Sequence, residues 1–193
     1  MDVINFLHFK DVSIVNVGND RLNIKYSVVE MKEAASSFRD LAFLQDMVKT
    51  IVYIDNRKDV DSVAKYVGSL IGNKQVAAYH SIKSEELKKL RIEEFKNNEK
   101  RVLISTEAAG MGCDIRDVKR VVQYGYPKTL SMLIQRLGRA ARDPTLSGTS
   151  IFLVPPRPGS DVPQELRGYV ETTGCRRRYL NTYFENVHQD VAV

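Results

Sequence analysis

Five short apolar runs alternate along the chain with stretches in which apolar residues recur at helical spacing. The runs are rich in β-branched residues and predict strands at residues 50–54, 75–79, 101–105, 120–124 and 150–154. The stretches between them predict helices at residues 60–71, 84–95 and 130–137. Strands that alternate with helices require crossover connections, so the sequence predicts a three-layer α/β fold around a mostly parallel sheet. The loops at the carboxyl ends of its strands are then expected to carry the functional residues.

The segments on either side of this region have weaker patterns. Before it, residues 13–17 and 24–29 are expected to be strands and residues 33–48 a helix. After it, the prolines of residues 155–159 predict a linker, because proline has no backbone N–H for a helix or a central strand.

A helical appendage is predicted after this linker, at residues 164–183 with a break near Gly174. We therefore divide the chain into an N-terminal entry segment (1–48), a core (49–154), and a linker with a helical appendage (155–193).

The composition is that of an ordinary globular protein and excludes collagen-like, mucin-like and broadly disordered chains. Of the 193 residues, 43% are hydrophobic and 27% are charged. No apolar run approaches the roughly 20 residues that a membrane-spanning helix needs, and the N-terminus lacks the pattern of a signal peptide. We therefore expect an intracellular protein, in the nucleus if its source is eukaryotic, with no membrane partner.

Charge and cysteine content add little to this. The net charge of +5 permits a polyanionic partner without requiring one. The two cysteines, Cys113 and Cys175, lie far apart and form neither a disulfide framework nor a complete zinc site. A protein with two separate cysteines and no disulfide framework fits a reducing compartment.

The densest chemical signal is the run Gln-Arg-Leu-Gly-Arg-Ala-Ala-Arg-Asp at residues 135–143. Arg139 and Arg142 are three positions apart, so on a helix their side chains leave the same face and can grip one anion through their forked donors. The spacing alone fits an ordinary solvated basic turn equally well.

A second signal is the loop at residues 105–114, which follows a predicted strand. It contains small residues and two glycines, Gly110 and Gly112, which allow the backbone to approach a ligand closely. A tight connection from a strand to a helix has the same composition, so this loop alone does not identify a ligand.

Together these segments resemble the second RecA-like lobe of superfamily 2 helicases, and most closely that of the RecQ family of DNA helicases. Residues 52–57 are similar to helicase motif IV, residues 79–81 to motif IVa, residues 106–114 to motif V and residues 135–143 to motif VI, in the family's order. The resemblance implies a RecA-like fold, related to that of P-loop NTPases, with a short helical appendage at the C-terminus.

Two further features favour RecQ proteins over RNA helicases. Residues 21–23 (Arg-Leu-Asn) are similar to an arginine-proline-asparagine motif of the family, and residues 175–177 (Cys-Arg-Arg) with 183–184 (Tyr-Phe) resemble the start of its zinc-binding subdomain. The family's zinc site needs three more cysteines, so Cys175 is at most a single ligand and also fits an ordinary helical cysteine. Zinc is expected only in a longer form.

The chain departs from the family pattern at four places. Leu22 stands where the family has proline, Asp55-Asn56 where it has asparagine-serine, and Ile82 and Ala141 where it has glycine. None of these differences removes a charged catalytic group.

The resemblance also implies roles for single residues, with ATP bound between this lobe and a first RecA-like lobe. Arg142 would be the arginine finger that stabilises the transition state of phosphoryl transfer, and Arg139 would assist it. The other implied ATP-binding residues are Gln135, Asp114 and Gly112. The implied contacts to the backbone of single-stranded DNA are Asn56, Arg57, His80, Ser81 and Thr106. Standing alone, His80 also fits a satisfied loop histidine.

We expect the ATP-binding residues to cluster at the carboxyl edge of the sheet, exposed toward the first lobe. Arg142 is expected to make few bonds within its own lobe, because a finger that acts across a cleft has to reach its partner. A buried ion pair between Arg142 and a carboxylate of its own lobe would instead indicate a structural role.

The sequence holds neither the GxxxxGK[ST] loop that cradles phosphates nor an acidic motif that holds Mg²⁺. The resemblance therefore implies the second motor lobe of an ATP-dependent 3′ to 5′ DNA helicase, which uses ATP and Mg²⁺ together with a first lobe of the same parent protein. Its expected substrate is single-stranded or forked DNA, and the isolated chain is expected to be inactive.

Two alternatives stay open. The chain could be a stand-alone, non-enzymatic module that binds nucleic acid or a protein. It could also be the lobe of an RNA helicase, although motif VI of those proteins usually opens with histidine where this chain has Gln135. Residues 1–7 resemble the last helix of a first lobe, which fits a cut-out of a longer helicase as well as a natural single-lobe protein.

Overall fold

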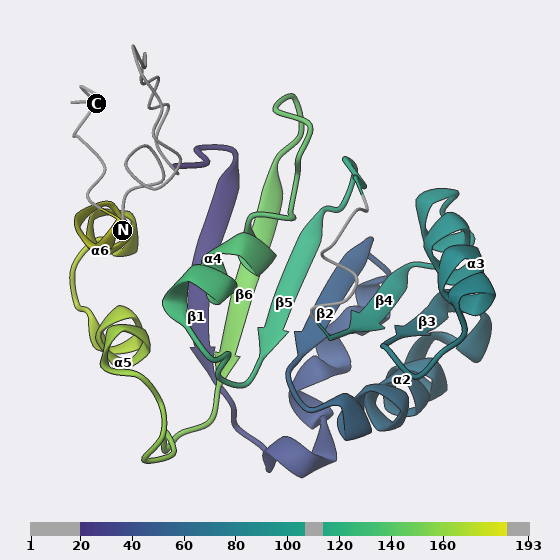
Figure 1. The fold of residues 1–193 in the computed structure, drawn as a ribbon, viewed down its shortest axis with the longest axis horizontal. Coiled ribbons are helices and arrows are strands. Elements are labelled where there is room, and N and C mark those ends of the chain that lie inside the picture. The colour runs from purple at the N-terminus through teal and green to yellow at the C-terminus, as the bar shows by residue number, and fades with distance from the viewer. Residues whose placement is uncertain (1–19, 107–113, 185–193) are drawn as a thin grey trace, which may run out of the picture.

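A single sheet of six parallel strands forms the centre of the computed structural model, which describes residues 20–106 and 114–184 (Figure 1). The strands lie side by side in the order β1-β6-β5-β2-β4-β3, and every neighbouring pair is parallel. Their bounds are β1 (Ile24–Glu30), β2 (Thr50–Ile54), β3 (Val76–Tyr79), β4 (Val102–Ser105), β5 (Arg120–Tyr124) and β6 (Gly148–Val154). The predicted α/β fold around a parallel sheet is confirmed.

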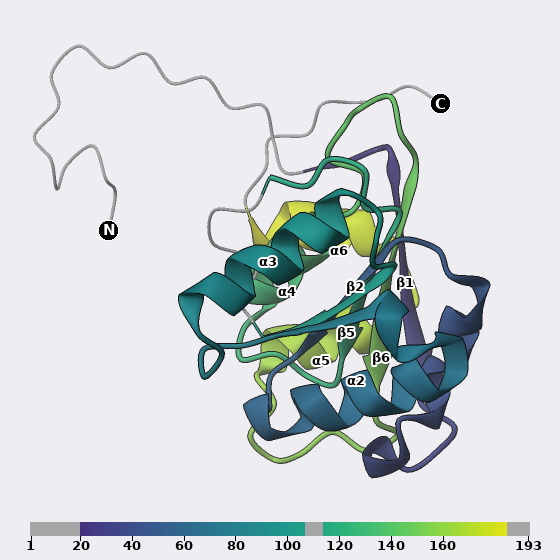
Figure 2. The ribbon, with the colours of Figure 1, turned by 90° about the vertical axis from the view of Figure 1, so that its right-hand side faces the viewer.

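Helices cover both faces of this sheet. Helix α2 (Arg57–Ile71) lies on one face, and helices α3 (Glu85–Lys96) and α4 (Leu130–Leu137) lie on the other (Figure 2). Helices α5 (Gln164–Glu171) and α6 (Arg176–Tyr183) follow β6 and lie near β1 (Figure 1). The molecule therefore has the three layers that the sequence predicts, with a helical appendage at one side.

The two faces of the sheet have separate hydrophobic cores, because successive residues of a strand point to opposite faces. In β2, Ile51 and Tyr53 pack in the core that contains residues of α3 and α4, whereas Val52 and Ile54 pack in the core that contains residues of α2. All four side chains are buried. Burial on both faces explains why the strands read as nearly continuous apolar runs in the sequence.

Polar residues fix where three of the helices begin. Asn56, Ser84 and Thr129 each accept a hydrogen bond from a backbone N–H in the first turn of α2, α3 and α4. Such caps satisfy N–H groups that have no partner within the helix. Helix α2 ends at Ile71 and is followed by the C-cap residue Gly72, whose φ of 92° is a conformation that favours glycine.

The predicted helix at residues 33–48 is wrong. This segment forms two 3₁₀ turns, Ala35–Ser37 and Arg39–Asp46, which are separated by Phe38 with a φ of 59°. The buried residues Leu41 and Leu44 are three positions apart, and a spacing of three fits a 3₁₀ helix as well as an α-helix.

The regions outside residues 49–154 add one strand to the sheet and two helices beside it. The strand expected at residues 24–29 is confirmed as β1, which pairs with β6, so the sheet begins within the N-terminal segment. The strand expected at residues 13–17 lies outside the described residues. The helical appendage is also confirmed, with its break between α5 and α6 at residues 172–175.

Candidate functional site

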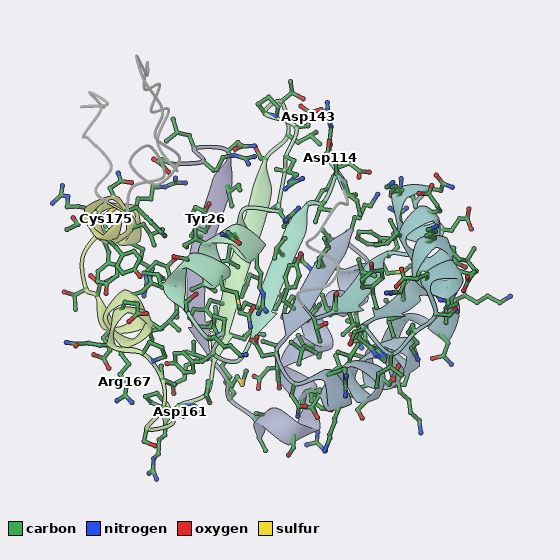
Figure 3. All side chains as sticks on the ribbon, in the orientation of Figure 1. Tyr26, Asp114, Asp143, Asp161, Arg167 and Cys175 are labelled. Atoms are coloured by element: carbon green, nitrogen blue, oxygen red, sulfur yellow. The ribbon has the colours of Figure 1, made fainter. Side chains whose placement is uncertain are left out.

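The candidate residues form two groups at opposite ends of the sheet. Asn56, Arg57, His80, Ser81 and Thr106 directly follow β2, β3 and β4, which are neighbours in the sheet, so they lie at its carboxyl edge. Asp114 lies at the other end, near Asp143 and near the start of β5 (Figure 3). Hydrogen bonds confirm this position, because Ala141 N–H donates to the carbonyl of Val118 and Asp143 N–H to that of Arg116.

The expectation that the ATP-binding residues lie at the carboxyl edge is therefore wrong for Asp114 and Arg142. Helix α4 starts beyond the carboxyl end of β5 and runs back across the face of the sheet, so the turn after it reaches the amino edge. Gln135 is an exposed residue on α4 itself. Gly112 lies outside the described residues.

The spacing of Arg139 and Arg142 predicted that both lie on a helix, and this prediction is wrong. Helix α4 ends at Leu137, and a turn carries the chain through both arginines. Ala141, between them, is buried and has a φ of 42°. A left-handed conformation costs an L-residue about 1–2 kcal/mol, so other contacts must hold this turn in place.

Those contacts come from both sides of the turn. Arg21 Nη2 and Asn23 Nδ2 donate to the carbonyl oxygen of Ala141 over 2.6 and 2.8 Å, and Asn23 Nδ2 also donates to that of Leu146 over 2.9 Å. The backbone of β6 approaches closely, since a Cβ on Gly148 would lie 2.9 Å from the Cβ of Ala141. Arg21 and Asn23 thus stabilise the turn that carries the two arginines.

Arg142 forms an ion pair with Asp114 of its own lobe. Its Nη1 lies 3.1 Å from Oδ1 of Asp114, while Nε of Arg116 donates to Oδ2 of the same carboxylate over 3.0 Å. Hydrogen bonds from Arg116 and then from Arg142 hold the pKa of Asp114 below its usual value, so the carboxylate is ionised at neutral pH. The side chain of Arg142 is 31% exposed and that of Asp114 54%, so this pair is not buried and Arg142 is accessible from solvent.

At the carboxyl edge, two of the candidates are engaged within the lobe. Asn56 caps α2, and its Nδ2 also donates to Oδ2 of Asp59 over 2.8 Å. His80 is only 3% exposed, and its Nε2 lies 3.1 Å from Oδ2 of Asp61. Asn56, Arg57 and Ser81 are exposed, whereas Thr106 is half-buried. Of these, Arg57 and Ser81 are the exposed side chains that a nucleic-acid backbone can reach without breaking a helix cap.

A partly buried polar cluster lies at the carboxyl ends of β2 and β5, and the sequence pattern did not predict it. Arg136 of α4 donates through Nη1 and Nη2 to the two carboxylate oxygens of Asp55, each over 3.0 Å, and through Nη1 to Oε1 of Gln123 over 2.8 Å. Its guanidinium also lies 5.4 Å from the ring centre of Tyr53. One signal was present in the sequence: Arg136 shares the apolar face of α4 with Leu133 and Leu137, and a buried arginine requires an acidic partner.

Cys175 is the N-cap residue of α6 and is exposed. Backbone N–H groups of Arg178 and Arg177 lower the pKa of its thiol. Within residues 20–106 and 114–184, no group of three or more His, Cys, Asp or Glu side chains is placed to hold a metal ion. Among the same residues, no helix is long and apolar enough to cross a membrane.

Comparison with known proteins identifies the class to which this fold and site belong. The helicase conserved C-terminal domain family matches residues 33–144, more than half of the chain. The chain therefore belongs to this family of helicase domains.

Among its relatives, the chain is 33% identical over 136 residues to the DEAD-box ATP-dependent RNA helicase 35A of Oryza sativa subsp. japonica, and the match covers 67% of this chain and 21% of that protein. It is 27% identical, over an alignment of 213 residues, to the bifunctional 3'-5' exonuclease/ATP-dependent helicase WRN of Mus musculus, with 96% of this chain and 15% of that protein covered. The chain spans less than a quarter of the length of the curated relatives it matches.

Solved structures show the same fold. The C-terminal domain of the DEAD-box protein Dbp5 aligns with a TM-score of 0.60 at 20% identity, over 86% of this chain and 88% of that one. A DEAD box protein from the hyperthermophile Methanococcus jannaschii aligns with a TM-score of 0.63 at 23% identity, over 84% of this chain and 40% of that one. The chain has the RecA-like fold of a helicase C-terminal lobe.

Proposed function

We propose that the chain is the second motor lobe of an ATP-dependent 3′ to 5′ DNA helicase of the RecQ type. The turn after α4 carries the proposal, because it holds Arg142 accessible to solvent beside Asp114, with the half-buried Arg139 three residues before it. Arg142 would then stabilise the charge that develops on the γ-phosphate of ATP, with Arg139 assisting. Mg²⁺ would be held by acidic groups of the first lobe, since this chain has no acidic motif of that kind.

The preference for DNA has three supports. The match to WRN extends over 96% of the chain, whereas the match to RNA helicase 35A extends over 67%. Arg21 and Asn23, which resemble part of a RecQ motif, contact the turn of motif VI directly. A relationship to a DNA helicase Q-like protein of Arabidopsis thaliana, at 28% identity, agrees with this preference.

An RNA helicase lobe is the second candidate, because several relatives of this chain are named RNA helicases. A stand-alone module that binds nucleic acid without hydrolysing ATP is the third. All three candidates use the exposed residues at the carboxyl edge to contact a phosphate backbone.

Binding of matched single strands tests the choice between DNA and RNA. We expect the isolated chain to bind a fluorescent oligo(dT) weakly and more tightly than an oligo(rU) of equal length, as measured by anisotropy. The affinity should fall steeply with salt, because contacts to phosphates release condensed counterions. A clear preference for oligo(rU) would select the RNA helicase instead.

Arg57→Ala should weaken this binding and lower the slope of log affinity against log salt by about 0.7, the contribution of one phosphate contact on a single strand. Lys25→Ala is the matched control, because Lys25 is an exposed cation on β1, at the opposite edge of the sheet from β3. Equal effects of the two variants would argue that only net charge matters and that Arg57 makes no specific contact.

The isolated chain should show no ATPase activity above background, because the groups that cradle the phosphates and hold Mg²⁺ are absent from the sequence. The measurement is phosphate release with and without single-stranded DNA, using homogeneous protein. Turnover that is stimulated by DNA and proportional to the concentration of the chain would contradict the assignment to a second lobe.

A further inference from the structure

Arg177 of helix α6 contacts residues 20–24, which lead into β1. The guanidinium of Arg177 donates to the carbonyl oxygen of Arg21 over 3.2 Å from each Nη, and from Nη2 to that of Ile24 over 2.6 Å. It also forms an ion pair with Asp20 and lies 5.3 Å from the ring centre of Tyr26. Arg177 therefore fixes the backbone of residues 21–24 to the appendage.

The same segment is bonded to the turn of the two arginines. Arg21 uses its backbone carbonyl for Arg177 and its own guanidinium for the carbonyl of Ala141. Arg21 Nε lies 3.3 Å from Oδ1 of Asn23, which leaves the Nδ2 donors of Asn23 directed at the carbonyls of Ala141 and Leu146. A continuous series of hydrogen bonds thus runs from α6 to the residue that precedes Arg142.

The turn at the end of this series is tightly constrained. Ala141 is fully buried, its N–H donates to the carbonyl of Val118 over 2.7 Å, and its carbonyl accepts the two side-chain donors. Its φ of 42° is a conformation that isolated alanine disfavours. Loss of the two donors would therefore release the carbonyl and allow the turn, with Arg142, to take another conformation.

We propose that Arg177, Arg21 and Asn23 form a positioning relay through which helix α6 holds the turn that carries Arg139 and Arg142. All three relay residues lie outside residues 33–144, the part of the chain that matches the helicase family. The appendage and the N-terminal segment thus act on a motif that belongs to the shared domain. Displacement of α6 would loosen the arginine turn, which makes α6 a point of regulation for the site.

The effect of this relay on ATP turnover rests on the proposed function, but the relay itself does not. It is therefore tested without nucleotide, by NMR on the isotopically labelled chain. In Arg177→Ala, we expect shifts of the backbone amides of residues 141–146 and of the Arg142 Nε–Hε signal. Hydrogen exchange of the Ala141 amide should accelerate about tenfold, because local opening becomes easier when its supporting bonds are lost.

Arg178→Ala is the matched control, because Arg178 is an exposed neighbour on the same helix. It should leave the amides of residues 141–146 and the Arg142 side-chain signal unchanged. A purely structural role of Arg177 would shift the signals of α6 and β1 in the Arg177 variant and leave the Arg142 signal where it is. That result would overturn the relay.

Asn23→Asp keeps the test decisive if Arg177→Ala fails to fold. Its carboxylate has nearly the same shape as the amide but cannot donate to the carbonyls of Ala141 and Leu146. The relay requires the same shift of the Arg142 side-chain signal and the same faster exchange at Ala141, with the signals of α6 unchanged. An unaltered Arg142 signal in folded Asn23→Asp would also overturn the proposal.

Discussion

Arg142→Ala, in a protein that carries both lobes, should lower the turnover of ATP by a factor on the order of 10³ and leave the affinity for nucleotide nearly intact. The reason is that the contact of an arginine finger with the γ-phosphate strengthens as charge develops in the transition state, so its loss affects kcat rather than binding. The measurement combines steady-state ATPase kinetics with a direct titration of nucleotide.

The position of Arg142 in this lobe supports that expectation. The ion pair with Asp114 is exposed to solvent, and such pairs contribute little, so Arg142 can leave Asp114 for a phosphate at small cost. Asp114 does not lose its partner completely, because Arg116 still donates to its other oxygen. The pair therefore holds Arg142 near the site without burying it.

Two variants serve as controls. Arg142→Lys should be almost as damaging as Arg142→Ala, since an ammonium cannot reproduce the planar fork of a guanidinium. Arg116→Ala should leave turnover close to that of the unmodified protein, because Arg116 shares the carboxylate of Asp114 but precedes β5 and lies outside the turn. Near-normal turnover in either Arg142 variant would exclude Arg142 as the finger and transfer the role to Arg139.

The sequence predicts the sheet well because its strands are buried on both faces. After its first residue, Thr50, β2 is apolar at each position, so its run is visible without any knowledge of its neighbours. The segment before β2 is different. Its buried residues, Leu41 and Leu44, do not distinguish between an α-helix and a 3₁₀ helix. The left-handed residues Phe38, which divides the segment, and Met47, which ends its second turn, have no sequence signature.

The site is harder to predict, because it depends on where helix α4 ends. The spacing of Arg139 and Arg142 fits a helix, but the left-handed Ala141 turns the chain between them and is supported by residues more than a hundred positions away. The direction of α4 then decides which edge of the sheet the arginines reach. The spacing of residues along the chain reveals neither the turn at Ala141 nor the direction of α4. The order of the helicase motifs, in contrast, did identify the correct class of domain.

Arg136→Ala should be the most destabilising single substitution that we predict, with a loss of about 3 kcal/mol in the free energy of unfolding. For a chain of this size, that loss corresponds to a decrease in Tm of roughly 6–12 °C. Arg136 is 5% exposed and the side chain of Asp55 is 29% exposed, so removal of the guanidinium leaves a partly buried carboxylate without its cation and an unfilled space where the buried arginine stood. It also removes a donor from Oε1 of Gln123.

Thermal and urea unfolding of the isolated chain measure this effect, with Arg116→Ala as the control for an exposed ion pair, which should leave stability nearly unchanged. A second variant, Arg136→Met combined with Asp55→Ala, separates charge from packing. If the unpaired carboxylate is the main cost, this double variant should recover a large part of the stability that Arg136→Ala loses, because no unpaired charge is left. If Arg136→Ala proved as stable as Arg116→Ala, the cluster would not contribute to holding α4 against the loop after β2.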